Sequence, residues 1–143
     1  MSTLRMTPSP ACGRGGNSIE HLESFACELF TAAGMDAAIA ATTAKLLVLT
    51  DALGRRTHGL AMLPLYLAEI AKGTMSTSGQ PEVVRQRGVV ALWDGEYLPG
   101  QFVIAHAIDG AMPRAAEQGI AAVTVRRSHH IGCLAALAKR AVD

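Results

Sequence analysis

The stretch GIAAVTVRRSHHIG, residues 119–132, decides how the second half of this 143-residue chain folds. The run from Ile120 to Val125 is apolar and rich in β-branched residues, which predicts a short buried strand. The segment after Gly132 is apolar on one side and predicts a helix that runs to Asp143. A strand, a turn with two histidines and a helix therefore follow one another.

Two strands and a long helix are expected upstream of this stretch. Residues 82–87 and 89–94 read as short strands, and Asp94-Gly95 is a turn signal after the second. Residues 99–118 predict a helix that ends at Gly119. Pro113 lies inside that helix, so we expect a kink or an early break there.

Three further helices are expected in the first half of the chain. Asn17 and Glu20 have the spacing of a capping box and predict the start of the first helix, which Gly34 ends. A second helix should begin after Asp36 and end at Gly54. One side of it is expected to carry the apolar set Ile39, Thr43, Leu46, Leu47 and Leu53.

The third helix contains a proline near its start. Pro64 donates no backbone hydrogen bond, so it is tolerated only in the first turn. We therefore expect regular helix from about Ala61 until Gly73, with Leu60, Leu63, Leu67 and Ile70 on its apolar side.

These elements predict an α/β (α+β) fold in which a helical bundle precedes a small sheet. We expect a disordered tail over residues 1–17, a helical region over 18–75 and an α/β region over 76–143. Three strands leave open sheet edges. We therefore expect the chain to be the N-terminal part of a larger protein, or to need a partner for its missing sheet.

Composition excludes several classes of function. The chain has 13 Lys+Arg against 12 Asp+Glu, which argues against nucleic acid as a partner. Its apolar runs are too short to span a membrane. The three cysteines, Cys12, Cys27 and Cys133, form no metal-binding or disulfide pattern, and the N-terminus lacks the apolar stretch of a secretory signal. We therefore expect reduced thiols and a cytoplasmic protein.

Three of the five histidines lie at junctions between elements, where functional sites are commonly built. His58 lies between two helices, and His129 and His130 lie between the last strand and the last helix. Imidazole exchanges a proton near neutral pH, so each is a candidate acid or base. His21 and His106 are expected to be ordinary surface residues.

Other interpretations of these residues are weaker. Adjacent histidines seldom face one metal ion, and no Asp, Glu or Cys accompanies them at ligand spacing, so no metal site is expected. No Gly-x-Gly-x-x-Gly follows a strand, which argues against a Rossmann site. The turn before the last helix could present backbone N–H groups to an anion. Arg55 and Arg56 could belong to a DNA-binding unit, but the neutral net charge disfavours it.

The sequence contains, in this order, the blocks DALGRRTHGLAMLPLYLAEIAKG, VVALWDGEYLPGQ and GIAAVTVRRSHHIG. In content and order these blocks resemble the malate/L-lactate dehydrogenase family of NAD(P)H-dependent oxidoreductases, which is unrelated to the Rossmann lactate dehydrogenases. The resemblance covers about residue 18 to the end, with His58 and His130 72 positions apart, as in the family. It implies the start of a non-Rossmann, mixed-sheet cofactor domain over 76–143, in a chain less than half the family's length.

The resemblance implies roles for particular residues. His58 matches the family's proposed proton donor, and Thr57 stands where the family usually has a serine that acts with it. His130 matches a histidine beside the nicotinamide, which is an acid/base in some members. The segment that lines the cofactor corresponds to His130, Ile131, Gly132, Cys133 and Leu134. The implied cofactor is NAD or NADP, the substrate a small 2-oxo or 2-hydroxy acid or a related imino acid, and the full-length form a homodimer.

The sequence departs from the family's pattern at three positions. His129 replaces a usual asparagine and Ile131 a usual phenylalanine. Met62 stands where the family often has an arginine that grips the substrate carboxylate, and a thioether cannot make that charged pair. Our hypothesis is that Arg55 or Arg56 takes over this role. The alternative hypothesis for the polypeptide is a catalytically inactive truncated fragment that acts only as a helical association module.

Overall fold

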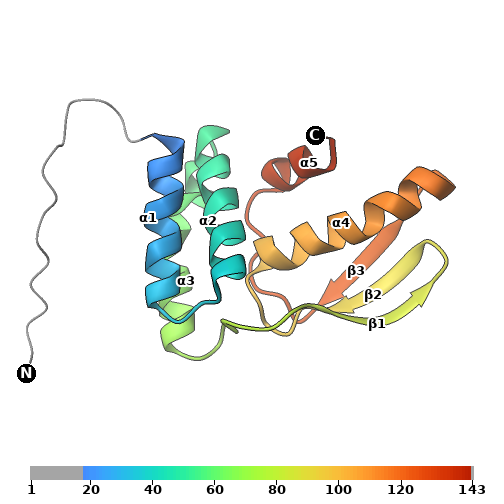
Figure 1. Ribbon diagram of the computed structural model, residues 1–143, viewed down its shortest axis with the longest axis horizontal. Helices are drawn as coiled ribbons and strands as arrows, with labels where there is room; N and C mark the ends of the chain where they lie inside the picture. The colour runs from blue at the N-terminus through green and yellow to red at the C-terminus, as the bar shows by residue number, and fades with distance from the viewer. Residues whose placement is uncertain (1–17, 143) are drawn as a thin grey trace, which may run out of the picture.

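The structure is a computed structural model that describes residues 18–142. Three helices form one end of the molecule, and a long helix lies across a three-stranded sheet at the other (Figure 1). The helical end contains α1 (Ile19–Ala32), α2 (Ala37–Ala52) and α3 (Leu63–Ala71), with the short 3-10 turns η1 (Arg56–His58) and η2 (Leu60–Met62) before α3. The other end contains β1 (Glu82–Arg87), β2 (Val90–Asp94), α4 (Gly100–Gln118), β3 (Ala122–Arg126) and α5 (Leu134–Val142).

The ends of the helices follow short-range signals. Ser18, rather than Asn17, caps α1, because its hydroxyl accepts a hydrogen bond from the His21 N–H at 3.2 Å. Asn17 and the predicted tail lie outside the described residues. Asp36 stands at the start of α2 as predicted, although its side chain makes no capping hydrogen bond. Gly34 and Gly119 have positive φ angles after α1 and α4, as helix-ending glycines do.

The helical end has a continuous apolar core. Phe30 of α1, Leu47 of α2 and Tyr66 of α3 are each at most 1% exposed and belong to one cluster of buried side chains. Four of the predicted apolar positions of α2 are buried, whereas Leu53 is 42% exposed because the helix ends before it. Regular helix in α3 begins at Leu63, two residues later than predicted, because two 3-10 turns precede it. Pro64 lies in its first turn.

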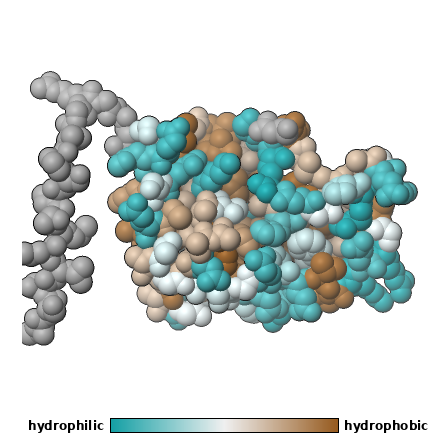
Figure 2. All heavy atoms as spheres, viewed as in Figure 1, coloured by the Kyte–Doolittle hydropathy of each residue, from teal (hydrophilic) through white to brown (hydrophobic). Residues whose placement is uncertain are grey.

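A second, smaller core cluster joins the two ends of the molecule. It contains Leu46 of α2, Ala105 of α4, and Ala136 and Leu137 of α5. The amphipathic last helix, predicted from residue 132 onward, therefore packs against both α2 and α4. Figure 2 shows apolar side chains gathered over the helical end and mostly hydrophilic ones over the sheet end.

The sheet is mixed, with strand order β1-β2-β3. β1 is antiparallel to β2, and β2 is parallel to β3, with α4 as the crossover between them. The predicted burial of β3 is wrong: its residues alternate between exposed and half-buried. β3 is an edge strand whose only neighbour in the described sheet is β2. Its exposed and half-buried side chains point to opposite faces of the sheet, and Val125, on the half-buried face, packs against the first core cluster. The helix predicted over residues 99–118 continues through Pro113 without the expected early break.

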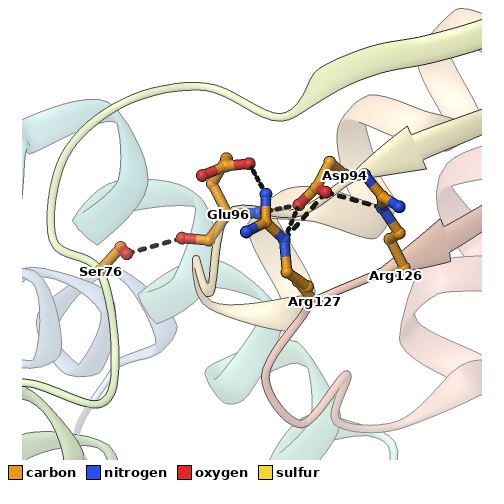
Figure 3. A network of polar contacts seen from close by, with 5 residues as sticks. All are labelled: Ser76, Asp94, Glu96, Arg126 and Arg127. Carbon is orange, nitrogen blue, oxygen red and sulfur yellow. Dashed lines mark hydrogen bonds and ion pairs between the residues drawn. The ribbon is translucent and has the colours of Figure 1, made fainter.

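A buried carboxylate ties the ends of β2 and β3 together (Figure 3). The Asp94 side chain is only 1% exposed and accepts hydrogen bonds from Nε of Arg126 and Nε of Arg127, each at 2.8 Å. Arg127 also pairs with Glu96, whose carbonyl accepts a hydrogen bond from the Ser76 hydroxyl at 2.6 Å. The pKa of Asp94 is held well below its usual range, mainly by the hydrogen bonds from Arg127. Burial of the carboxylate acts in the opposite direction. This network fixes the loop that leads to residues 128–132.

We predict that Asp94→Asn lowers the melting temperature at neutral pH, because two arginines lose their anionic partner. The native pKa is depressed, so the carboxylate's stabilisation is complete above its unfolded pKa of about 4 and is lost as the pH falls below that value. Thermal melts should therefore show a gap between wild type and variant at pH 7 that narrows at pH 3. A gap of equal size at both pH values would contradict this. Glu96→Gln, at an exposed side chain, is the control with the smaller effect.

Candidate active site

Two histidines that are far apart in the sequence lie beside each other. The ring centroids of His58 and His130 are 5.5 Å apart, with 30° between the ring planes. Both residues are exposed. One comes from the 3-10 turn before α3 and the other from the turn between β3 and α5. The structure therefore brings together two of the residues that the sequence proposed for one site.

His58 is held by its neighbours on the η1 segment. Thr57 Oγ1 lies 2.9 Å from His58 Nδ1, so hydroxyl and imidazole share a hydrogen bond. The Asp51 carboxylate accepts a hydrogen bond from the Leu60 N–H at 3.0 Å, which anchors the turn that follows the histidine. A Cβ on Gly59 would lie 2.1 Å from Asp51 Oδ1, so a larger residue there would displace this carboxylate.

His130 is supported from beneath by two buried polar side chains. Tyr66 Oη lies 3.1 Å from His130 Nδ1, and Gln101 Nε2 donates a hydrogen bond to Tyr66 Oη at 2.6 Å. Tyr66 is 1% and Gln101 2% exposed. Burial and then the nearby His58 lower the pKa of His130, which favours its neutral form. Burial raises the pKa of Tyr66, so its hydroxyl keeps its proton.

The turn that carries His130 packs tightly on the start of α4. A Cβ on Gly100 would lie 2.4 Å from the His129 carbonyl oxygen and 2.5 Å from that of His130. The His129 N–H donates to the Leu98 carbonyl at 3.2 Å, and His129 Nε2 lies 2.7 Å from the Thr74 carbonyl oxygen. His129 thus joins this turn to the segment after α3, away from the histidine pair.

The segment predicted to line the cofactor is only partly open. Leu134 is 68% exposed, whereas Ile131 and Cys133 pack against the second core cluster. Gly132 has φ of 76° and closely approaches Gln101 Nε2, so a Cβ there would lie 2.8 Å from that nitrogen. His130 and Leu134 are both exposed, and an imidazole and an aliphatic side chain are groups that suit a planar, partly apolar ring such as nicotinamide. His130 and Leu134 would contact such a group with their side chains, and Gly132 with its backbone.

The remaining candidates lie outside the pair. Met62 packs against the first core cluster, while Arg55 and Arg56 are exposed next to Thr57. His106 is half-buried rather than on the surface, and its Nδ1 lies 2.9 Å from the Phe102 carbonyl oxygen.

A hollow of about 420 Å³ lies between α2 and α5, and neither His58 nor His130 lines it. Among residues 18–142, no group of three or more His, Cys, Asp or Glu is placed to hold a metal ion.

The sequence did not predict the residues that support the two histidines, which are Tyr66, Gln101, Asp51 and Gly100. Tyr66 lies within an apolar helical stripe, where it reads as core. Gln101 is a polar residue at the start of the apolar run QFVIA, and that mismatch is the one signal that could have identified it. Their contacts join residues 35 and 64 positions apart, which no local pattern encodes.

Residues 17–143 match the family described as malate/L-lactate dehydrogenase. The chain belongs to this family. It is 32% identical over 115 residues to a malate/(S)-sulfolactate dehydrogenase of Methanothermus fervidus, and 31% identical over 115 residues to an L-lactate dehydrogenase of Cupriavidus necator. These alignments cover 80% of this chain in both cases, but only 34% and 33% of the two relatives.

Solved structures of the family have the same fold. A putative malate/lactate dehydrogenase from E. coli superposes with a TM-score of 0.81 at 28% identity, covering 85% of this chain and 34% of that one. A malate dehydrogenase from Pyrococcus horikoshii gives 0.76 at 31% identity, covering 80% and 33%. The fold expected from the family resemblance is therefore confirmed, and the chain spans about a third of the length of these relatives. Within residues 18–142 of the present chain, no helix is long and apolar enough to cross a bilayer.

Proposed function

We propose that the complete protein is an oxidoreductase that transfers a hydride between NAD(P)H and a small 2-oxo or 2-hydroxy acid or a related imino acid. The supporting observation is the pair of exposed imidazoles at 5.5 Å, each held in place by a hydroxyl-bearing neighbour. Relatives named as malate, sulfolactate and lactate dehydrogenases support the reaction class. One relative is named as NADP(+)-dependent, and either NAD or NADP is compatible with this proposal.

In this proposal the histidines handle the proton and the cofactor supplies the redox chemistry. Bound nicotinamide would deliver or accept the hydride. His58 gives a proton to the developing alkoxide or amine, or takes it in the reverse direction. Thr57 orients His58 through the hydrogen bond to Nδ1. His130 holds the reduced ring or shares in the proton transfer, and residues 130–134 line the cofactor.

The experiment that tests this function is a screen of the complete protein against 2-oxo acids and cyclic imines with NADH and with NADPH. Oxidation of either cofactor with a member of the panel is the expected result. The fluorescence of NADH or NADPH should also shift or be quenched when the reduced cofactor binds to the protein. No change in fluorescence with either cofactor would contradict the proposal.

The anionic end of the substrate needs a cation that Met62 cannot supply. Arg55 and Arg56 are exposed on the segment that carries His58, so we propose that one of them pairs with the substrate carboxylate. We predict that Arg55→Ala or Arg56→Ala raises KM for the acid substrate by about tenfold or more, while kcat changes less. Steady-state kinetics on the complete protein test this, with Arg85→Ala, in β1, as the control. Unchanged substrate affinity in both variants rejects the idea.

A second candidate is an inactive helical module that serves only in association. Ile19 and Phe25 of α1 are each 53% exposed, and such a module would use apolar side chains of this kind in its contacts. Such a module would leave NAD(P)H fluorescence unchanged, so the binding measurement separates the two candidates.

We further propose a homodimer in the cytoplasm as the working state of the complete enzyme.

A further inference from the structure

The hydrogen bonds around His130 identify which of its ring nitrogens carries the proton. The Gly132 backbone N–H donates a hydrogen bond to His130 Nδ1, with an N···N distance of 3.3 Å. A backbone N–H can only donate, so Nδ1 must present a lone pair to it. The proton of the neutral ring is then on Nε2.

Tyr66 makes a second contact with the same nitrogen. Its oxygen accepts a hydrogen bond from Gln101 Nε2 at 2.6 Å, which leaves the hydroxyl proton free to donate. That proton has two acceptors within reach, Nδ1 of His130 at 3.1 Å and the carbonyl oxygen of the same residue at 3.3 Å. Both acceptors belong to His130, so the hydroxyl holds this residue by ring and backbone together.

Gln101 fixes the direction of this chain of hydrogen bonds. Its side chain is 2% exposed, and Oε1 has no hydrogen-bond partner among the described residues. The amide contacts Tyr66 through its Nε2 donor. The absence of a Cβ at Gly132 leaves room for that amide beneath the turn.

We propose that Tyr66 and Gln101 are positioning residues that keep Nδ1 of His130 as an acceptor, so that His130 presents an Nε2–H to the substrate while His58 transfers the proton. This inference rests on the proposed function for its substrate. It narrows the proposed role of His130, which the proposed function describes as either holding the reduced ring or sharing in the proton transfer. A neutral imidazole that donates a hydrogen bond can polarise a carbonyl or imine without giving up its proton.

The groups that contact His130 come from η1, from α3 and from its own turn, and Gln101 of α4 reaches it through Tyr66. His58 contacts it from η1, and Tyr66 from α3. Gln101 of α4 and the Gly132 N–H are uncharged. Loss of the Tyr66 donor should therefore raise the pKa of His130, because one of the interactions that favour its neutral form is gone.

The test is NMR on the complete protein without cofactor, labelled with ¹⁵N-histidine, with His130 assigned from a His130→Gln variant. Above its titration midpoint, wild-type His130 should show a protonated Nε2 and an unprotonated Nδ1. Tyr66→Phe should raise the midpoint by about 0.5–1 pH unit, the size of one neutral hydrogen bond. Gln101→Leu should raise it less, and Tyr97→Phe, which removes the other tyrosine hydroxyl, should leave it unchanged.

Two outcomes would overturn the inference. A proton on Nδ1 in the wild type does so however the variants fold. A Tyr66→Phe protein that keeps its circular dichroism spectrum and its His130 midpoint does so as well. Neither readout needs cofactor or turnover, so a protein with the expected tautomer that fails to bind NAD(P)H would contradict the proposed function and leave the tautomer assignment standing.

Discussion

Replacing His58 with alanine in the complete enzyme should lower turnover by about 10²–10⁴-fold, the usual contribution of a positioned acid or base. The loss should appear in kcat, because the residue acts on the proton that moves during the reaction rather than on substrate affinity. Steady-state kinetics with the best substrate of the panel measure it.

The control for this substitution is His21→Ala, at an exposed position in the first turn of α1. It should leave turnover unchanged. A loss below about tenfold in His58→Ala would transfer the acid/base role to His130 and would contradict the division of tasks proposed for the two rings.

Gly100→Ala should displace the turn that carries His130. The new Cβ would lie within 2.5 Å of two backbone carbonyl oxygens, and backbone atoms cannot move away as the end of a flexible side chain can. Overpacking of this kind typically costs about 1–3 kcal/mol of the free energy of unfolding. We therefore expect a lower melting temperature and a shifted imidazole resonance of His130.

The same helix offers a matched control. Gly110→Ala places its Cβ 3.0 Å from Cζ2 of the Trp93 side chain, which lies at the sheet rather than at the histidine turn. This variant should leave the His130 resonance in place. A Gly100→Ala protein with wild-type stability and an unmoved His130 resonance would show that the turn does not depend on this contact.

Local sequence signals predicted most of the elements of this fold. The bounds of β1 agree with the prediction at both ends, and α4 ends at Gln118 as expected before Gly119. These features depend on turn residues and on apolar spacing within a few positions. The errors arose where residues distant in the sequence determine the outcome. A β-branched run predicts a strand, but whether the side chains of Ala122–Arg126 are buried depends on what covers the two faces of the sheet.

The candidate site divides in the same way. His58, Thr57 and His130 were identifiable because a histidine at a junction is chemically distinctive and because the surrounding blocks resemble a family. Tyr66 and Gln101 were not, since a tyrosine in an apolar stripe has the same pattern whether it only packs or also holds a histidine. The role of Met62 also depends on tertiary context, because the core accepts its side chain.

In the proposed function His58 and His130 face one nicotinamide, and an NMR titration of the complete protein with NADH and with NADPH shows whether both rings respond to it. The imidazole resonances of both residues should shift along a single saturation curve with at least one of the cofactors, while those of His21 and His106 stay in place. Resonances of the pair that remain unmoved with both cofactors, or that follow two different curves, would contradict the claim.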